Sequence, residues 1–138
     1  MGFFTENKEV RVQGFVLKLV NNNCPELRAL MEGPRIDSRV NLVVVVMVVP
    51  LENDQIQKGQ TLMAVTKEFS NSGVAVVLER PRGFDQVVLG FRVDGEMTFV
   101  KAQAKHLSPM GGGFHQLGLQ MLEVVHPTDY PGLETMSF

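Results

Sequence analysis

The chain has 138 residues and a formal net charge of −2, a length that suits one domain with one hydrophobic core. Hydrophobic residues make up 44% and charged residues 20%, a balance that excludes an intrinsically disordered chain. The nearly neutral charge excludes a general attraction to nucleic acid polymers or anionic lipids, so any anion binding must be local. The single cysteine, Cys24, excludes an internal disulfide and fits a reducing compartment.

No segment has the pattern of a targeting signal or a membrane span. The first residues lack the basic start and the small-residue cleavage site of a secretory signal. The most apolar run, residues 42–49, is less than half of the roughly 18–20 residues that cross a bilayer. We therefore expect a cytoplasmic protein without membrane insertion.

The N-terminal segment predicts less regular structure than the remainder of the chain. Residues Glu9 to Val20 mix apolar and charged side chains and fit either a helix or a strand. Three asparagines, Asn21 to Asn23, predict a break. Cys24 to Met31 predicts a short helix, with Pro25 near its first turn and Gly33 after its end. Residues 1–32 are thus expected to form an N-terminal extension, helical or extended.

The rest of the chain has a strong β pattern. Val40 to Val49 is almost continuous valine, which favours an extended strand buried on both faces, and Pro50 is predicted to end it. Five more candidate strands follow at residues 61–66, 74–78, 86–93, 97–107 and 114–125. Asp94-Gly95 predicts a hairpin turn, and residues 108–113 predict a loop. Six short strands joined by turns indicate an all-β antiparallel barrel or sandwich, and barrel closure would remove exposed edges.

Two arginines precede the first of these strands. Arg35 and Arg39 lie four residues apart in a segment that Gly33 and Pro34 mark as a loop. Two guanidiniums on one loop can bind a phosphate bidentately or pair with the O6 and N7 atoms of guanine. The alternative is a solvated arginine pair, held by Asp37 or Glu32.

A second polar segment, Glu68 to Gly73, lies between two predicted strands. Glu68 and Ser70 are two residues apart, so in an extended chain they point the same way. The carboxylate can accept from guanine N1 and N2, the hydroxyl can donate to a phosphate or a ring nitrogen, and Gly73 would permit positive φ and close backbone approach. The alternative is an ordinary strand connection whose serines satisfy local backbone groups.

The two segments together carry more information than either one. The order is Arg35-x-x-x-Arg39, then 28 residues, then Glu68-x-Ser70-x-x-Gly73 and an apolar strand. This order resembles the PilZ domain family, whose pattern is R-x-x-x-R followed after a few tens of residues by [D/N]-x-S-x-x-G. Leu117-Gly118 matches a Leu-Gly pair in the family's last strand. The resemblance covers about residues 33–126.

The resemblance implies a six-stranded antiparallel PilZ-type β-barrel at residues 33–128, followed by a C-terminal tail at 129–138. It also implies a non-catalytic receptor for the bacterial second messenger cyclic di-GMP, with no cofactor. Carried over by position, Arg35 and Arg39 would contact guanine and phosphate, Glu68 and Ser70 would read polar atoms, and Gly73 would allow close approach. Binding would reorder the arginine loop and pass a signal to a downstream protein partner.

Two departures from the family pattern affect the implied ligand. Glu68 stands where the family prefers Asp or Asn, so its carboxylate reaches one methylene farther and can crowd the base. Pro34 stands where a basic residue accompanies binding of a stacked ligand dimer, so one ligand molecule is expected. Some family members bind no nucleotide and act as protein adaptors, which leaves an adaptor as the alternative function.

Other chemistry-bearing residues form no recognisable site pattern. His106, His115 and His126 lack the spacing of metal ligands, so we expect surface histidines and no metal. No flanking sequence supports Cys24 as a nucleophile, and we expect no enzyme activity. Lys101 and Lys105 would share a strand face and add positive potential near a ligand, or else be solvated.

Overall fold

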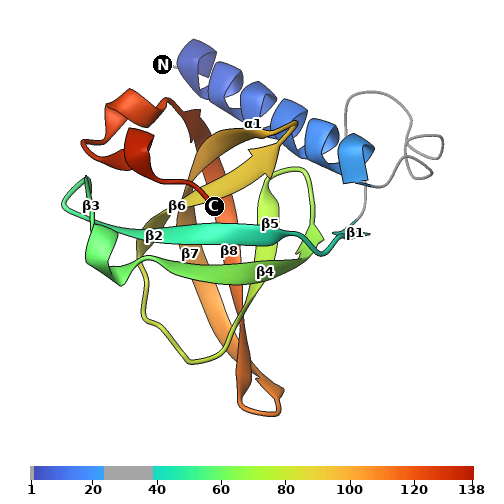
Figure 1. Cartoon of the computed structure of the whole chain (residues 1–138). Coiled ribbons are helices and arrows are strands. Elements are labelled where there is room, and N and C mark those ends of the chain that lie inside the picture. Colours follow the sequence, from blue (N-terminus) through green and yellow to red (C-terminus); the bar gives the residue numbers. More distant parts are fainter. Residues whose placement is uncertain (1, 24–38) are drawn as a thin grey trace.

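The computed structural model describes the backbone of residues 2–23 and 39–138, with side chains for residues 8–20 and 39–138. In this part of the chain, one long helix is followed by eight strands and three short 3₁₀ helices (Figure 1). The helices are α1 (Gly2–Asn23), η1 (Lys58–Gln60), η2 (Pro127–Asp129) and η3 (Leu133–Thr135). The strands are β1 (Val40–Asn41), β2 (Val45–Glu52), β3 (Gln55–Ile56), β4 (Leu62–Phe69), β5 (Gly73–Leu78), β6 (Gln86–Val93), β7 (Glu96–Gly111) and β8 (Phe114–Val125).

Helix α1 settles the ambiguous N-terminal pattern. Its buried side chains recur at a spacing of three and four residues, which is the spacing of one helix face: Val12, Phe15, Val16, Leu19 and Val20. The predicted break at Asn21 to Asn23 is wrong, because the helix continues through Asn23. Packing of an amphipathic face outweighs the weak helix propensity of asparagine. The predicted helix at Cys24 to Met31 lies outside the described residues. No helix in the described part of the chain is long and apolar enough to cross a membrane.

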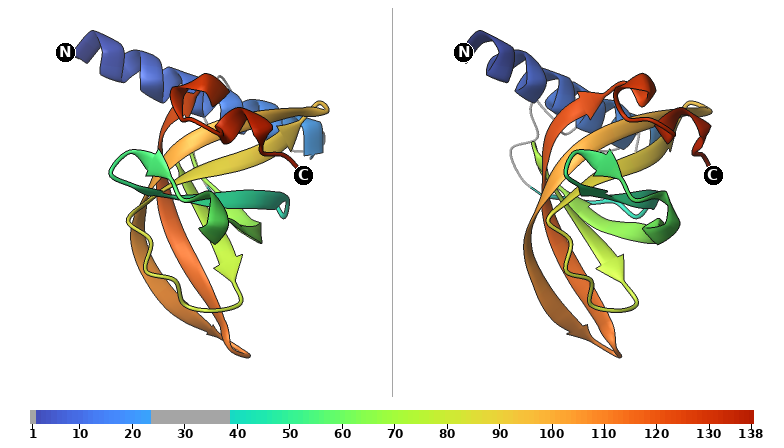
Figure 2. Two further views of the ribbon diagram at one scale, coloured as in Figure 1. Left: turned by 60° about the vertical axis from the view of Figure 1, so that its left-hand side comes forward. Right: turned by 90° about the vertical axis from the view of Figure 1, so that its left-hand side faces the viewer.

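The strands form one antiparallel sheet that closes on itself. Its order is β1-β4-β5-β8-β7-β6-β2-β3, and a further pairing between β2 and β4 joins six of the strands into a ring. The closure is uneven, because β2 and β4 share four residue pairs whereas β7 and β8 share eleven. The β7–β8 hairpin consequently projects beyond the ring (Figures 1 and 2). The expected six-stranded antiparallel barrel is confirmed as the fold class.

Most strand bounds agree with the pattern of the sequence. Strands β6 and β8 begin and end at the predicted residues, and Asp94 and Gly95 both have positive φ in the turn after β6. The prediction that Pro50 ends the first strand is wrong, since β2 continues through it to Glu52. The fixed φ of proline suits an extended chain, and only one ladder N–H is lost.

The connection between β7 and β8 is shorter than the predicted loop at residues 108–113. Strand β7 continues to Gly111, and the turn is made by glycines with positive φ at positions 111–113. Proline and glycine are typical of loops, but here they lie within the end of the β7–β8 hairpin, where the strand pairing is irregular. The register between the two strands shifts between Pro109 and Gly111.

Apolar side chains pack on both faces of the ring. The larger core lies between the inner faces of the strands and α1, where the rings of Phe15 and Phe91 have centroids 5.0 Å apart. A smaller core forms on the outer face, where Tyr130 and Leu133 of the C-terminal segment cover β2, β6 and β7. Burial raises the pKa of Tyr130 above its usual value of 10.0, an effect that the nearby Lys101 ammonium opposes. The C-terminal segment is therefore an integral layer of the packing.

A buried threonine ties the segment between β1 and β2 to the ring. Thr66 is 1% exposed, and its hydroxyl donates to the carbonyl of Leu42 at 2.6 Å and accepts from the N–H of Val44 at 2.9 Å. Residues 42–44 belong to no strand, and these side-chain bonds add to one main-chain bond, from the N–H of Thr66 to the carbonyl of Val44 at 2.9 Å. Thr66 thus holds the chain in place directly after Arg39.

We predict that Thr66→Val destabilises the fold by about 2–3 kcal/mol, because two buried main-chain groups lose their partner. Thr61→Val is the matched control. The Thr61 hydroxyl oxygen is buried and makes no hydrogen bond within the described part of the chain, so its loss should change stability by less than about 0.5 kcal/mol. Urea unfolding followed by circular dichroism measures both variants. Equal stability of the two would contradict the tethering role of Thr66.

Candidate functional site

A cross-strand row of residues forms a trough on the outer face of the sheet. Glu68 of β4 is opposite Ala75 of β5, Ala75 is opposite Gly118 of β8, and Gly118 is opposite His106 of β7. The two central residues are the smallest available, whereas the outer two carry long polar side chains. The row therefore makes a shallow floor with a polar wall at each end, and it lines a pocket of about 190 Å³.

A β-bulge lies at each end of this row. In β4 the register shifts between Thr66 and Glu68, and in β7 it shifts between Ala104 and His106. Each bulge adds one residue to its strand, Lys67 in the first case and Lys105 in the second. Because of the first bulge, Glu68 faces outward although Thr66, two residues earlier, points into the core. Bulges of this kind often re-aim side chains beside functional sites.

Glu68, which forms one wall of the pocket, is ion-paired with Arg39. Arg39 donates from Nη1 to Oε1 of Glu68 at 3.0 Å, across 29 residues of sequence. The Arg39 side chain is 75% exposed, whereas that of Glu68 is 19% exposed. Such a solvent-exposed pair contributes only about 0–1 kcal/mol, so Arg39 can leave Glu68 at little cost. The predicted partners of Arg39, Asp37 and Glu32, lie outside the described residues.

The turn between β4 and β5 forms one rim of the pocket. Ser70 accepts from the N–H of Gly73 through its side-chain oxygen at 3.1 Å, and its own N–H donates to the carbonyl of Gly73 at 2.9 Å. The positive φ that a glycine would permit is not used at this position, since Gly73 does not have a positive φ. Glycine is required here for space: a Cβ atom would lie 2.8 Å from Ser70 Oγ.

The opposite wall is an imidazole ring. A Cβ atom added to Gly118 would lie 2.9 Å from Cε1 of His106 and 3.3 Å from its Nδ1, so the ring lies directly over the glycine. Glycine within a strand commonly marks such a close approach. The His106 ring therefore packs closely against Gly118, beside Lys105 and Gln116, which also line the pocket.

Four of the five predicted ligand-binding residues line this one pocket: Arg39, Glu68, Ser70 and Gly73. The fifth, Arg35, lies outside the described residues. The sequence reasoning missed His106 and Gln116, because their strand pairing decides their position. Lys105 was noted together with Lys101, but only Lys105 lines the pocket. Lys101 instead forms an ion pair with Asp54 at 3.5 Å.

The remaining histidines have other surroundings. His126 caps η2, since its side chain accepts from the N–H of Thr128. His115 lies in the β7–β8 hairpin, opposite Pro109. Within the residues that the structure describes, no three His, Cys, Asp or Glu side chains gather as metal ligands would.

Comparisons with known proteins give matches among solved structures alone. No protein-family model matches the chain, and no curated protein matches it. Among solved structures, the chain is similar to the Bacillus subtilis inhibitor of motility (MotI/DgrA), with a TM-score of 0.49 and 14% sequence identity. The match covers 76% of this chain and 49% of that protein, so this chain spans about half of its length.

We predict that Gly73→Ala destabilises the fold by about 1–2 kcal/mol, because the new methyl group expels the Ser70 hydroxyl from the turn. Gly83→Ala is the matched control, since a Cβ atom there would meet nothing within 4 Å. Its effect should stay within about 0.5 kcal/mol. Thermal and urea unfolding measure both variants. An unchanged stability of Gly73→Ala would show that the Ser70 contact does not constrain the turn.

Proposed function

We propose that this chain is a non-catalytic PilZ-type receptor that binds cyclic di-GMP in the bacterial cytoplasm and signals to a protein partner. The observation that carries the proposal is the convergence of Arg39, Glu68, Ser70 and Gly73 on one pocket. These residues come from the two sequence segments that resemble the R-x-x-x-R and [D/N]-x-S-x-x-G motifs. Arg35, four residues before Arg39, is proposed as the second guanidinium of the same site.

The chemistry of the pocket suits a guanine dinucleotide. A guanidinium can bind a phosphate or the O6 and N7 edge of guanine in a bidentate manner. A carboxylate accepts from the N1 and N2 donors on the opposite edge of that base. The flat floor of Ala75 and Gly118 leaves room for a planar ring, and the exposed face of an imidazole such as His106 can stack on one. Lys105 adds a cation beside the phosphates.

Binding would require Arg39 to exchange partners. In the free protein its guanidinium is paired with Glu68, and a ligand phosphate would compete for it. The pair is exposed and weak, whereas a charge-assisted bidentate bond to phosphate is stronger. The proposed signal is this exchange, because it moves the segment that connects the barrel with the N-terminal part of the chain.

We predict that the wild-type protein binds cyclic di-GMP saturably and that Arg35→Ala/Arg39→Ala abolishes the binding. The double variant removes both guanidiniums but neither of the buried cores, so circular dichroism should show an unchanged fold. Isothermal titration calorimetry measures affinity and stoichiometry, and we expect one ligand molecule per chain. Arg11→Ala, an exposed arginine on α1, is the control that keeps wild-type affinity. Absence of binding by the wild type would refute the receptor function.

We further predict that Glu68→Asp tightens binding of cyclic di-GMP by about ten- to a hundredfold. The shorter carboxylate relieves crowding of the base, and the gain corresponds to one repaired hydrogen bond of about 1–3 kcal/mol. The same titration measures the change. Weaker binding by Glu68→Asp would mean that the longer side chain is fitted to the ligand.

A PilZ-like adaptor that binds no nucleotide is the second candidate. It is favoured by exposed apolar side chains on β2 and β4, among them Val45 and Met63 at 50% and 47% exposure. Such a protein would act through protein contacts alone. If neither the wild type nor Glu68→Asp releases or absorbs heat when titrated with cyclic di-GMP at high concentration, the adaptor function is favoured.

A further inference from the structure

The outer face of β2 and β4 carries a strip of exposed apolar side chains. We name it the β2–β4 strip, and it consists of Val43, Val45, Met63 and Val65, which are 38–70% exposed. Val45 is paired with Val65, and Met63 with the buried Met47, so the strip lies on one continuous face. The C-terminal segment covers Met47, Val49 and Leu51 farther along β2 but leaves the strip open.

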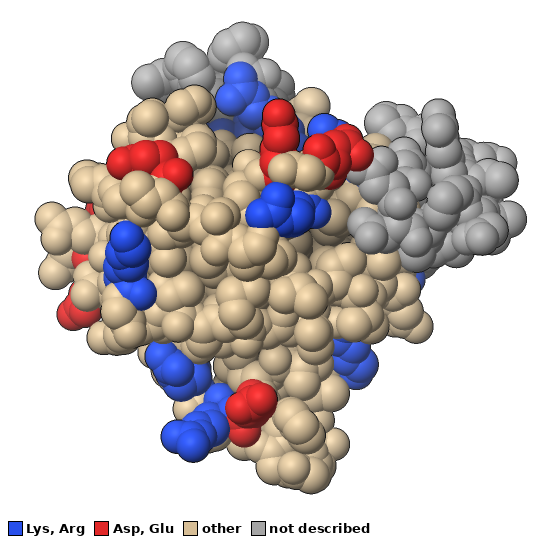
Figure 3. All heavy atoms as spheres, viewed as in Figure 1, with Lys and Arg blue, Asp and Glu red and all other residues tan. Residues whose placement is uncertain are grey.

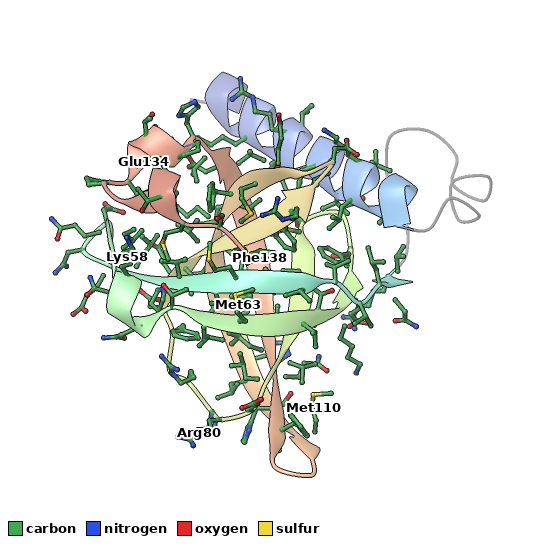
Figure 4. All side chains as sticks on the ribbon, in the orientation of Figure 1. Lys58, Met63, Arg80, Met110, Glu134 and Phe138 are labelled. Carbon is green, nitrogen blue, oxygen red and sulfur yellow. The ribbon has the colours of Figure 1, made fainter. Side chains whose placement is uncertain are left out.

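Basic side chains lie close to this strip. Arg80 and Arg82 line a hollow of about 170 Å³ together with Met63, and Lys67 follows Val65 by two residues in β4. Lys58 of η1 lies farther away, and its ammonium donates to the Thr135 hydroxyl of the C-terminal segment at 3.1 Å; both Lys58 and Met63 are labelled in Figure 4. None of these four cations forms an ion pair with a carboxylate of the described residues. Figure 3 shows a central area that is poor in charge, with blue and red groups around it.

The charge of this border is opposite to that of the whole chain. The chain has a net charge of −2, yet the residues around the strip and its hollow include the cations Arg80, Arg82 and Lys67 and the acidic Glu79. Arg82 also stacks on Phe84, with its guanidinium carbon 5.0 Å from the ring centroid, which fixes it beside the hollow. The resulting positive potential favours a partner with acidic groups.

We propose that the β2–β4 strip docks an acidic protein segment in which carboxylates flank apolar side chains. One apolar side chain would enter the hollow between Leu62, Met63 and Leu78, and the carboxylates would meet Arg80 and Arg82. An apolar anchor with charged groups around it is the usual form of a binding hot spot. The hollow beside the strip offers space for a side chain of a protein segment, whereas lipid binding requires only an apolar face that is buried in the headgroup region. The docking does not depend on a nucleotide in the pocket.

Short synthetic peptides test this proposal with the whole 138-residue chain. In the probe peptides Asp or Glu alternates with Leu or Phe; in one control set Lys replaces the acids, and in another Ser replaces the apolar residues. Fluorescence anisotropy measures their binding at low and high salt. We expect binding of the acidic apolar peptides alone, and weaker binding at high salt.

Two pairs of variants locate the contact. Arg80→Glu/Arg82→Glu reverses the charge, and Val45→Thr/Val65→Thr removes apolar surface while keeping β-branched residues in the strands. Each is expected to weaken binding by about tenfold or more. The controls are Arg11→Glu and Val10→Thr on α1, which change an exposed cation and an exposed valine away from the strip. Hydrogen exchange should show protection at residues 43–65 on binding.

The proposal is wrong if the acidic peptides do not bind or if all variants bind them equally well. It is also wrong if the protein binds vesicles of phosphatidylcholine and phosphatidylglycerol but no peptide. Self-association in sedimentation that the strip variants abolish would likewise contradict it. Titration of the strip variants with cyclic di-GMP separates this proposal from the receptor function. Docking that fails while the nucleotide still binds refutes the docking surface alone.

Discussion

The pairing of β2 with β4 is the contact on which the rest of the structure depends. It is short, yet it turns an open sheet into a ring and so encloses the larger core. Without it, the valine-rich β2 would expose an unpaired edge. The adjacent pairing of β1 with β4 places Asn41 opposite Glu68, so that Arg39 meets the Glu68 carboxylate, and Thr66 fixes residues 42–44 between the two pairings. Closure of the barrel and assembly of the pocket therefore both depend on pairing with β4.

The candidate site illustrates how a regular sheet acquires a polar trough. The two central positions of the row are the small residues Ala75 and Gly118, and a bulge directly precedes each of the two wall residues, Glu68 and His106. The pocket is thus built from strand irregularities on a rigid scaffold, which holds its side chains more firmly than a mobile loop would.

The sequence pattern predicted most strands correctly, because β-branched residues and turn residues determine the backbone conformation at their own positions. Strands β6 and β8 and the turn at Asp94-Gly95 follow directly from that local chemistry. The helix through Asn23 and the strand through Pro50 could not be predicted, since tertiary packing overrides weak local preferences. The same limit applies to the site. His106 and Gln116 reach the pocket only through strand pairing, and Lys101 is separated from Lys105 by bulges that break the simple alternation of faces.

The bulge at Lys67 affects how many residues must separate Arg39 from Glu68 in the sequence. The extra residue adds nothing to the ladder, because Thr66 and Glu68 already occupy consecutive pairing positions opposite Val76 and Ala75. A shorter chain that lacked Lys67 would keep the carboxylate on the outside and Phe69 on the inside. The register therefore allows the number of residues between Arg39 and Glu68 to differ by one while both keep their places at the pocket.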